Sequence, residues 1–209
     1  MILKSSRMVF LLGALILPLM ACGNFKTFQT YYVAPVPAQM ARSWHVVGVD
    51  VTVPEKLTVS EEHSFEPKAD IMWREDPIGD RRAQVAVIMK AAIAQGAAPL
   101  HGPRAVRLQV TMKRFHALTL EAESVNISGV GVHNVEFDIA VVDARTGAVL
   151  LPAVSMDASL PALTGVEMIN ARLKGQSQKS QITAHVAATI AGWLDVGPDQ
   201  RGSFVRVGE

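Results

Sequence analysis

The residues best suited to chemistry in this 209-residue chain are six histidines, one cysteine and several closely spaced carboxylates. No two histidines have the spacing of a helical metal-ligand pair, and the HExxH pattern is absent. The sequence also contains no GxSxG, SxxK or P-loop pattern, so the common hydrolase and phosphoryl-transfer sites have no basis in it. The acids Glu61, Glu62, Glu121 and Glu123 lie in polar surroundings that would leave their pKa values unshifted. We therefore expect no catalytic residues, no metal site and no cofactor.

Recognition is a second kind of chemistry, and residues 73–82 concentrate the side chains that suit it. This segment contains an aromatic residue, three arginines and three acids at the N-terminus of a predicted helix. Arginines and the free amides of a helix N-terminus can bind an acidic group of a partner. The alternative is local capping, in which two of the aspartates stabilise the helix and the tryptophan packs as a lid. The partner-binding candidates here are Trp73, Arg74, Asp76, Asp80 and Arg81.

Two predicted strands carry charges on the face that would meet solvent. Arg107 and Lys113 on one strand could lie opposite Glu136 and Asp138 on the next. Exposed cross-strand pairs contribute only about 0.2 to 1 kcal/mol each, so a solvated surface by itself accounts for them. The functional alternative is a docking face, or an open edge to which a strand of another protein adds. Arg107, Lys113 and Glu136 complete the set of partner-binding candidates.

The first 21 residues have the layout of an export signal. Lys4 and Arg7 precede an apolar run at 8–21 that ends in small residues. A transmembrane helix needs about 20 apolar residues, whereas this run is shorter and contains Gly13 and Pro18. We therefore predict that residues 1–21 are a signal peptide that is removed.

The residues Leu19-Met20-Ala21-Cys22 resemble the bacterial lipobox. This resemblance implies cleavage before Cys22, diacylglycerol and palmitate on Cys22, and a protein that faces the periplasm from a lipid anchor. Two or more acyl chains make such an anchor stable, at about 0.8 kcal/mol for each buried methylene. In the enteric sorting rule that comes with the resemblance, Gly23 favours the outer over the inner membrane. The alternative role for Cys22 is that of a buried core cysteine.

The chain without its signal peptide is almost neutral. Loss of Lys4 and Arg7 reduces the 20 basic residues to 18, against 19 acidic ones. Nucleic-acid binding depends on a basic surplus, and a polybasic membrane patch depends on clustered basic residues. We therefore expect no nucleic-acid partner and attachment to the membrane through the lipid anchor. The single cysteine also excludes a disulfide framework.

Hydrophobic periodicity predicts the elements that position these residues. Apolar and polar residues alternate in three segments, and a turn at 143–147 leads into a fourth strand. The predicted strands cover 44–53, 106–113, 134–141 and about 148–159. Apolar spacings of three and four predict one helix from Asp76 to Gly96, with Ile78 on its buried face, and another around Ile182, Val186 and Ile190. Residues 161–175 read as a loop.

Strands with one polar face require helices on the opposite face only. We therefore expect an α+β fold in two layers, with a mostly antiparallel sheet of about four strands and two helices packed on one face. The single domain would cover residues 44–197. Residues 22–43 would be the lipidated N-terminus and a flexible spacer of roughly 25 Å. Residues 198–209 would form a C-terminal tail.

This layout resembles small proteobacterial envelope lipoproteins, including auxiliary lipoproteins of lipid-transport ABC systems. Residues 73–82, and Gln178-Lys179 with Ile182 and His185, are also similar to an uncharacterised alphaproteobacterial lipoprotein family. The resemblance implies a non-enzymatic accessory or binding module of an envelope complex, with an envelope protein as its partner. Two alternatives stay open. A carrier of an apolar ligand or lipid needs a cavity between helices and sheet, and a hydrolase needs a histidine beside an acid in a cleft.

Overall fold

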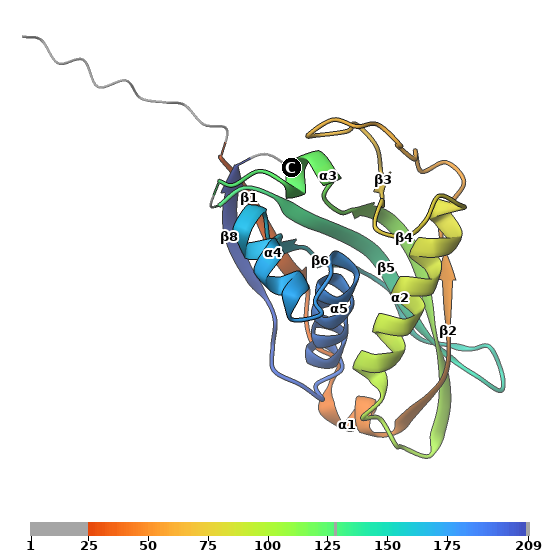
Figure 1. Ribbon diagram of the computed structural model, residues 1–209. Coiled ribbons are helices and arrows are strands. Elements are labelled where there is room, and N and C mark those ends of the chain that lie inside the picture. The colour runs from red at the N-terminus through yellow and green to blue at the C-terminus, as the bar shows by residue number, and fades with distance from the viewer. Residues whose placement is uncertain (1–24, 128, 208–209) are drawn as a thin grey trace, which may run out of the picture.

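A computed structural model describes residues 25–127 and 129–207 (Figure 1). Its helices and strands alternate irregularly along the chain, as expected of an α+β protein. The strands are β1 (Phe25–Tyr32), β2 (Trp44–Thr52), β3 (Ile71–Met72), β4 (Arg104–His116), β5 (Val132–Asp143), β6 (Val149–Ala158), β7 (Leu160–Pro161) and β8 (Gly202–Val207). The helices are α1 (Ala38–Arg42), α2 (Arg81–Ala97), α3 (Leu120–Glu123), α4 (Gly165–Leu173) and α5 (Gln178–Trp193).

All the strands belong to one mixed sheet of eight strands, ordered β2-β4-β5-β6-β1-β8, with β3 beside β4 and β7 beside β5. β2 and β3 run parallel to β4, and the other pairs are antiparallel. The α+β class and the antiparallel pairing of β4 with β5 are confirmed. The prediction of about four strands and two helices is wrong, since the described residues contain eight strands and five helices. Two of the additional strands, β3 and β7, have two residues each, which is too short for any periodicity.

The other two additional strands come from the chain ends, where we expected a spacer and a tail. In β1 the side chains of Phe28, Thr30 and Tyr32 alternate into the core. β8 pairs with β1 from Phe25 opposite Val207 to Thr30 opposite Gly202. These strands form because each supplies hydrogen-bond partners to the other, over a separation along the chain that local patterning does not detect.

α2 and α5 form the helix layer on one face of the sheet (Figure 1). α2 begins at Arg81, not at Asp76, because Asp80 is its N-cap and accepts a hydrogen bond from Ala83 N at 3.1 Å. Ile78 therefore lies in the preceding loop and is 94% exposed, contrary to the predicted buried position. The second predicted helix is confirmed as α5, whose Ile182, Val186 and Ile190 are buried.

The segment expected to be a loop at 161–175 contains α4, a helix of nine residues. Met168 and Ala171 on α4 are buried, whereas Val166 and Ile169 are exposed. Apolar residues therefore occupy both sides of this helix, and this pattern conceals the single apolar face by which a helix is usually recognised.

The two large helices touch at Gly96, near the C-terminal end of α2. A Cβ atom at this position would lie 2.4 Å from the carbonyl oxygen of Ala187 and 2.8 Å from Cβ of Ile190, both on α5. Only glycine permits this distance, because backbone atoms of α5 cannot move aside as a flexible side chain would.

We predict that Gly96→Ala lowers the free energy of unfolding by about 1 to 3 kcal/mol, since α2 and α5 must separate to accept the methyl group. Chemical denaturation measures this change. Gly202→Ala is the matched control, because a Cβ atom at Gly202 would meet nothing within 4 Å. Equal stability of the two variants would contradict the close contact.

Candidate functional site

Two of the partner-binding candidates in residues 73–82 lie inside the fold. Trp73 is fully buried, with its ring edge-on to Phe115 at a centroid distance of 5.7 Å and its Nε1 donating to Asp76 Oδ2 at 2.8 Å. Arg81 is 4% exposed and donates to Glu61 Oε1 at 2.6 Å and to the carbonyl oxygen of Asp76 at 3.0 Å. Trp73 and Arg81 therefore have internal partners.

The neighbouring acids bind the N-terminus of α5. Glu75 accepts hydrogen bonds from the backbone amides of Gln178 at 3.0 Å and Lys179 at 2.7 Å, where the dipole of α5 is positive. Asp76 forms an ion pair with the ammonium of Lys179, which also lies 5.9 Å from the centroid of the Trp73 ring. The sequence predicted an acidic group of a partner at the N-terminus of the helix that begins in segment 73–82, whereas the structure has Glu75 of this chain at the N-terminus of α5.

Arg172 extends these contacts to two further helices. It lies on α4 and forms ion pairs with Glu75 at 3.3 Å and with Glu123 on α3 at 2.8 Å. We refer to the set as the corner network. Its members are Glu61, Glu75, Asp76, Arg81, Glu123, Arg172 and Lys179. It joins the loops around β3 to four helices.

The electrostatics of the corner network favour the ionised acids. The hydrogen bond from Arg81 lowers the pKa of Glu61. Burial raises the pKa of Asp76, but the hydrogen bonds from Lys179 and Trp73 outweigh burial, and the pKa lies below its usual value. Asp80 serves as the N-cap of α2, and Arg74 donates to the carbonyl oxygen of Glu61 at 2.5 Å. Capping and internal pairing therefore describe all five predicted residues of this segment.

The charged candidates on the strands lie on the sheet face opposite the large helices. Lys113 pairs with Asp138 at 2.6 Å, as the sequence predicted. Arg107 instead pairs with Asp50 on β2, its Nε donating to Oδ2 at 2.7 Å. Glu136 lies opposite Arg114 on β4 and Asp157 on β6. Lys113 and Glu136 thus lie on neighbouring strands, whereas Arg107 lies six residues away along β4, and none of the three belongs to the corner network.

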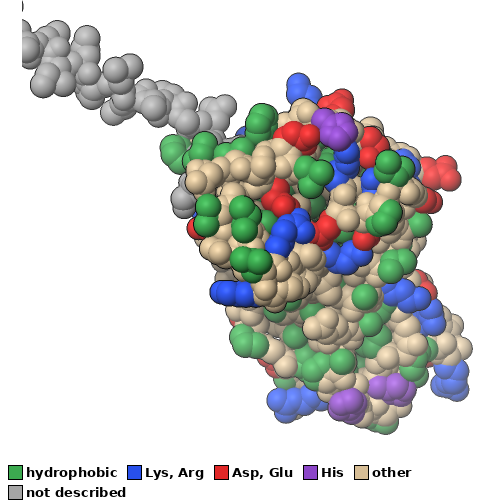
Figure 2. All heavy atoms as spheres, in the orientation of Figure 1, with side chains coloured by type: hydrophobic (Ala, Val, Ile, Leu, Met, Phe, Trp, Pro, Cys, Tyr) green, Lys and Arg blue, Asp and Glu red, His purple; other side chains and the backbone are tan. Residues whose placement is uncertain are grey.

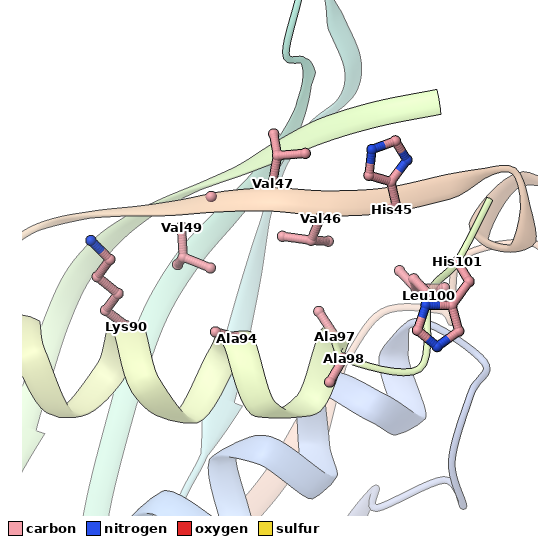
Figure 3. A pocket seen from close by; sticks show the side chains of 11 residues that line it. His45, Val46, Val47, Val49, Lys90, Ala94, Ala97, Ala98, Leu100 and His101 are labelled. Carbon is pink, nitrogen blue, oxygen red and sulfur yellow. The ribbon is translucent and has the colours of Figure 1, made fainter. Parts of the chain in front are cut away.

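An apolar groove lies between β2 and the C-terminal half of α2 (Figure 3). Its volume is about 460 Å³. The floor and walls are apolar and the ends are polar. The lining residues include Val46, Val49, Ala94, Ala97 and Leu100, with Lys90 at one end and His45 and His101 at the other. The groove exists because the alanines of α2 are too short to reach β2, which valine or leucine at these positions would do.

The strand beside this groove is an edge of the sheet. β2 pairs with β4 on one side and ends the strand order on the other. A strand in a parallel pair directs alternate N–H and C=O groups to its two sides, so an edge strand offers half of them to a further strand. The register shifts between Val46 and Gly48, and the intervening Val47 is 51% exposed. An exposed edge and an apolar groove together suit an extended polypeptide whose side chains enter the groove. Sequence reasoning offered an open edge for strand addition as one alternative but missed the groove, because the groove depends on how far α2 stands from β2.

His63, His133 and His185 do not form the arrangement that a hydrolase needs. His63 lies 3.0 Å from Glu121, but its side chain is 67% exposed on an open surface. His185 Nε2 is 2.8 Å from Thr30 Oγ1, yet this hydroxyl donates to the Ser159 carbonyl at 3.0 Å, so His185 must donate to it and cannot accept its proton. Burial lowers the pKa of His133 to about 3, so this residue is neutral. No group of three or more metal-ligating residues occurs within 25–127 and 129–207.

Buried side chains occupy the interface between the helices and the sheet, where a carrier of an apolar ligand would need a cavity. Phe137, Ile182 and Trp193 lie in this interface with at most 1% exposure. The groove beside β2 is the apolar space described above, and it lies at the surface.

The predicted lipidation site, Cys22, falls outside the described residues. Among the helices that are described, none combines the length and hydrophobicity needed to cross a membrane.

The corner network predicts a specific response of stability to pH. An acid whose pKa is lowered by folding stabilises the fold above its ordinary pKa, which is 3.8 for Asp76, and this stabilisation is lost as the pH falls through the folded value. We expect Asp76→Asn to lower the free energy of unfolding by about 1 to 2 kcal/mol at pH 7. The difference from the wild type should shrink below that ordinary pKa, as measured by urea denaturation across pH.

Asp138→Asn is the matched control, because it removes a carboxylate from an exposed ion pair, which contributes less than about 1 kcal/mol. A larger loss for Asp138→Asn than for Asp76→Asn would contradict the structural role of the corner network.

Several solved structures resemble this chain at low similarity. A predicted lipoprotein from Caulobacter crescentus CB15 is 16% identical, with a TM-score of 0.37, over 76% of this chain and 91% of the other. The PelC dodecamer from Paraburkholderia phytofirmans is 14% identical, with a TM-score of 0.33, over 84% and 98%. A Xanthomonas campestris protein of the DUF330 family is 12% identical, with a TM-score of 0.38, over 78% and 94%. At these scores we derive neither fold nor function from them.

A comparison with curated proteins finds no match to this sequence. The family comparison is informative, because residues 44–209 match a family of unknown function, DUF6778. The expectation of an uncharacterised family is therefore confirmed, while its alphaproteobacterial origin and its similarity to ABC-transport auxiliary lipoproteins stay predictions. The chain belongs to the family of unknown function DUF6778.

Proposed function

We propose that this protein is a membrane-anchored lipoprotein that binds an envelope protein as a non-enzymatic accessory module. The observation that carries the proposal is the edge of β2, with which no other described strand pairs, beside an apolar groove. The partner would be an extended segment of another envelope protein. Its backbone would pair with β2, and alternate side chains would enter the groove between Val49 and Leu100.

The anchor is inferred from the sequence. A basic start, an apolar run and Leu19-Met20-Ala21 before Cys22 together fit the lipobox. A lipid on Cys22 would place the domain on the periplasmic side, and Gly23 favours the outer membrane over the inner one. The domain itself has nearly balanced charge, so the anchor rather than a basic patch would hold the protein to the membrane.

The structure favours the β2 edge over the segment 73–82 as the partner site. Trp73 and Arg81 are buried, and Asp76 already pairs with Lys179. A partner would have to break these contacts in order to use the same groups, at a cost of about 1 to 3 kcal/mol for each unsatisfied group. The backbone edge of β2 carries no such penalty.

The two other functions have less support. A carrier needs enclosed apolar space, whereas Phe137 and Trp193 fill the interface between the sheet and the helices. A hydrolase needs a base in a cleft, whereas His63 is on open surface and His185 is a hydrogen-bond donor to Thr30. A binding role requires neither feature.

We predict that Cys22→Ser abolishes lipidation, so that the protein accumulates as an uncleaved precursor or leaves the membrane fraction. Fractionation and mass spectrometry of the N-terminus measure both changes. Gly23→Asp is the matched variant, because it keeps Cys22 and should be lipidated but retained in the inner membrane. Unchanged processing and membrane retention of Cys22→Ser would exclude the anchor.

We predict that a photo-crosslinking residue in place of Val47 captures one envelope protein in living cells. Val149, the first residue of β6, is the control position because it is similarly exposed, at 62% against 51% for Val47. Ala94→Glu should abolish capture at Val47, since it places a carboxylate in the apolar groove. Equal capture from both positions, or capture that survives Ala94→Glu, would exclude the groove. A crosslink between two copies of this chain would show that the groove serves self-association and not an envelope partner.

A further inference from the structure

A separate surface is defined by the point at which the lipid anchor would join the domain. β1 begins at Phe25, only three residues after Cys22. Three residues span at most about 11 Å, well below the roughly 25 Å expected of a spacer that extends to residue 43. A lipid on Cys22 would therefore hold the start of β1 close to the bilayer surface.

The contacts of β1 identify the segments that share this end of the molecule. Lys26 forms an ion pair with Glu66 at 3.6 Å, which brings the loop around residue 65 to the start of β1. Arg206 on β8 lies opposite Lys26 in the register of the two strands. A Cβ atom at Gly129 would lie 3.9 Å from Nη1 of Arg206. Figure 1 shows β1, β8, α3 and α4 gathered towards the end of the molecule at which β1 begins.

The loop before β5 connects this end to α4. Thr164 Oγ1, at the N-cap of α4, donates to the carbonyl oxygen of Ile127 at 3.3 Å. At the other end of α4, Arg172 pairs with Glu123 on α3. Contacts at both ends of the helix thus hold α4 near the end of the sheet at which β1 begins.

Exposed apolar side chains are concentrated on these segments. α4 buries Met168 and Ala171 but exposes Val166, Ile169 and Leu173, with Leu173 82% exposed. Exposed apolar residues on the other segments at this end of the molecule are Phe25, Phe65, Leu120 and Ile127. Figure 2 shows hydrophobic side chains on the face of the molecule where α4 lies. A soluble monomer seldom exposes such a concentration of apolar residues without a partner.

We propose that this surface, which consists of the outer side of α4 with Phe25, Phe65 and Ile127, rests in the interface of the membrane that holds the anchor. The proposal rests on the proposed lipidation of Cys22. An interfacial helix lies in the membrane plane with its apolar side among the headgroups and upper acyl chains. The tether removes most of the entropic cost of association, so a small apolar area suffices.

The charges around this surface argue for apolar contact rather than for electrostatic attraction. Lys26 pairs with Glu66, and Arg172 pairs with Glu75 and Glu123. Attraction to anionic lipid needs clustered basic residues without such neighbours. A membrane of zwitterionic lipid is therefore sufficient for the contact.

This orientation has a consequence for the β2 groove. Its polar end contains His45, whose Nδ1 lies 2.7 Å from the carbonyl oxygen of Gly102. Figure 1 shows the N-terminal end of β2, together with α1, at the end of the molecule opposite the start of β1. With α4 on the membrane, this end of the groove projects into the periplasm, where an envelope partner can reach it.

The test uses the lipidated protein with one added cysteine, either Ile169→Cys or Val149→Cys, labelled with an environment-sensitive dye. Lipidated Cys22 does not react with the dye, and the two positions are similarly exposed, at 59% and 62%. Each protein is reconstituted into phosphatidylcholine vesicles that carry a nitroxide quencher on the upper acyl chain. We expect a shift to shorter emission wavelength and several-fold stronger quenching at position 169 than at position 149.

Two outcomes would overturn the proposal in distinguishable ways. Equal quenching at both positions, in protein that floats with the vesicles, would show that the anchor holds and the surface does not touch lipid. Protein that fails to float and reacts with dye at Cys22 would show that the lipidation proposal has failed, and the surface proposal with it. Leu173→Asp in the Ile169→Cys protein should abolish the quenching, and because Leu173 is exposed, circular dichroism should remain that of the folded protein.

Discussion

The close contact between α2 and α5 at Gly96 determines how the helix layer covers the sheet. A Cβ atom there would lie 2.4 Å from a backbone oxygen of α5, so the two helices approach as closely as their backbones allow. On its other side, α2 presents Ala94 and Ala97 to β2, and these methyl groups leave the apolar groove open. The distribution of small residues along one helix therefore produces both a close contact with α5 and the groove to which we assign partner binding.

The corner network shows why charged residues are an uncertain guide to binding sites. Residues 73–82 combine an aromatic ring with several charges, which is the composition of many recognition sites. The fold uses the same side chains to hold loops and helices together, because a partly buried charge needs an opposite charge nearby. Glu75, for example, accepts hydrogen bonds from two amides at the N-terminus of α5. The surfaces left for partners are the apolar ones, whose composition attracts less notice in a sequence.

The proposed functions of the two surfaces are related through the shape of the molecule. The sheet and the two large helices form an elongated body, with the start of β1 and α4 at one end and α1 at the other (Figure 1). An anchor at the first end and an open strand edge that extends to the second would let the domain reach from the membrane towards a partner. Rigid packing of α2 on α5 would maintain this separation, since neither helix can tilt without opening the contact at Gly96.

The sequence by itself determined the α+β class, β4 with β5, and helix α5, because each of these has a strong local period or a distinct turn. The predictions of a signal peptide and of a lipobox at Cys22 likewise rest on the sequence alone, because both patterns are local. Only the tertiary structure decided that residues 25–32 and 202–207 are strands, since each depends on a partner far away along the chain. It also decided that Trp73 is buried and that α4 exposes Ile169, because burial depends on which surfaces meet and not on the type of residue.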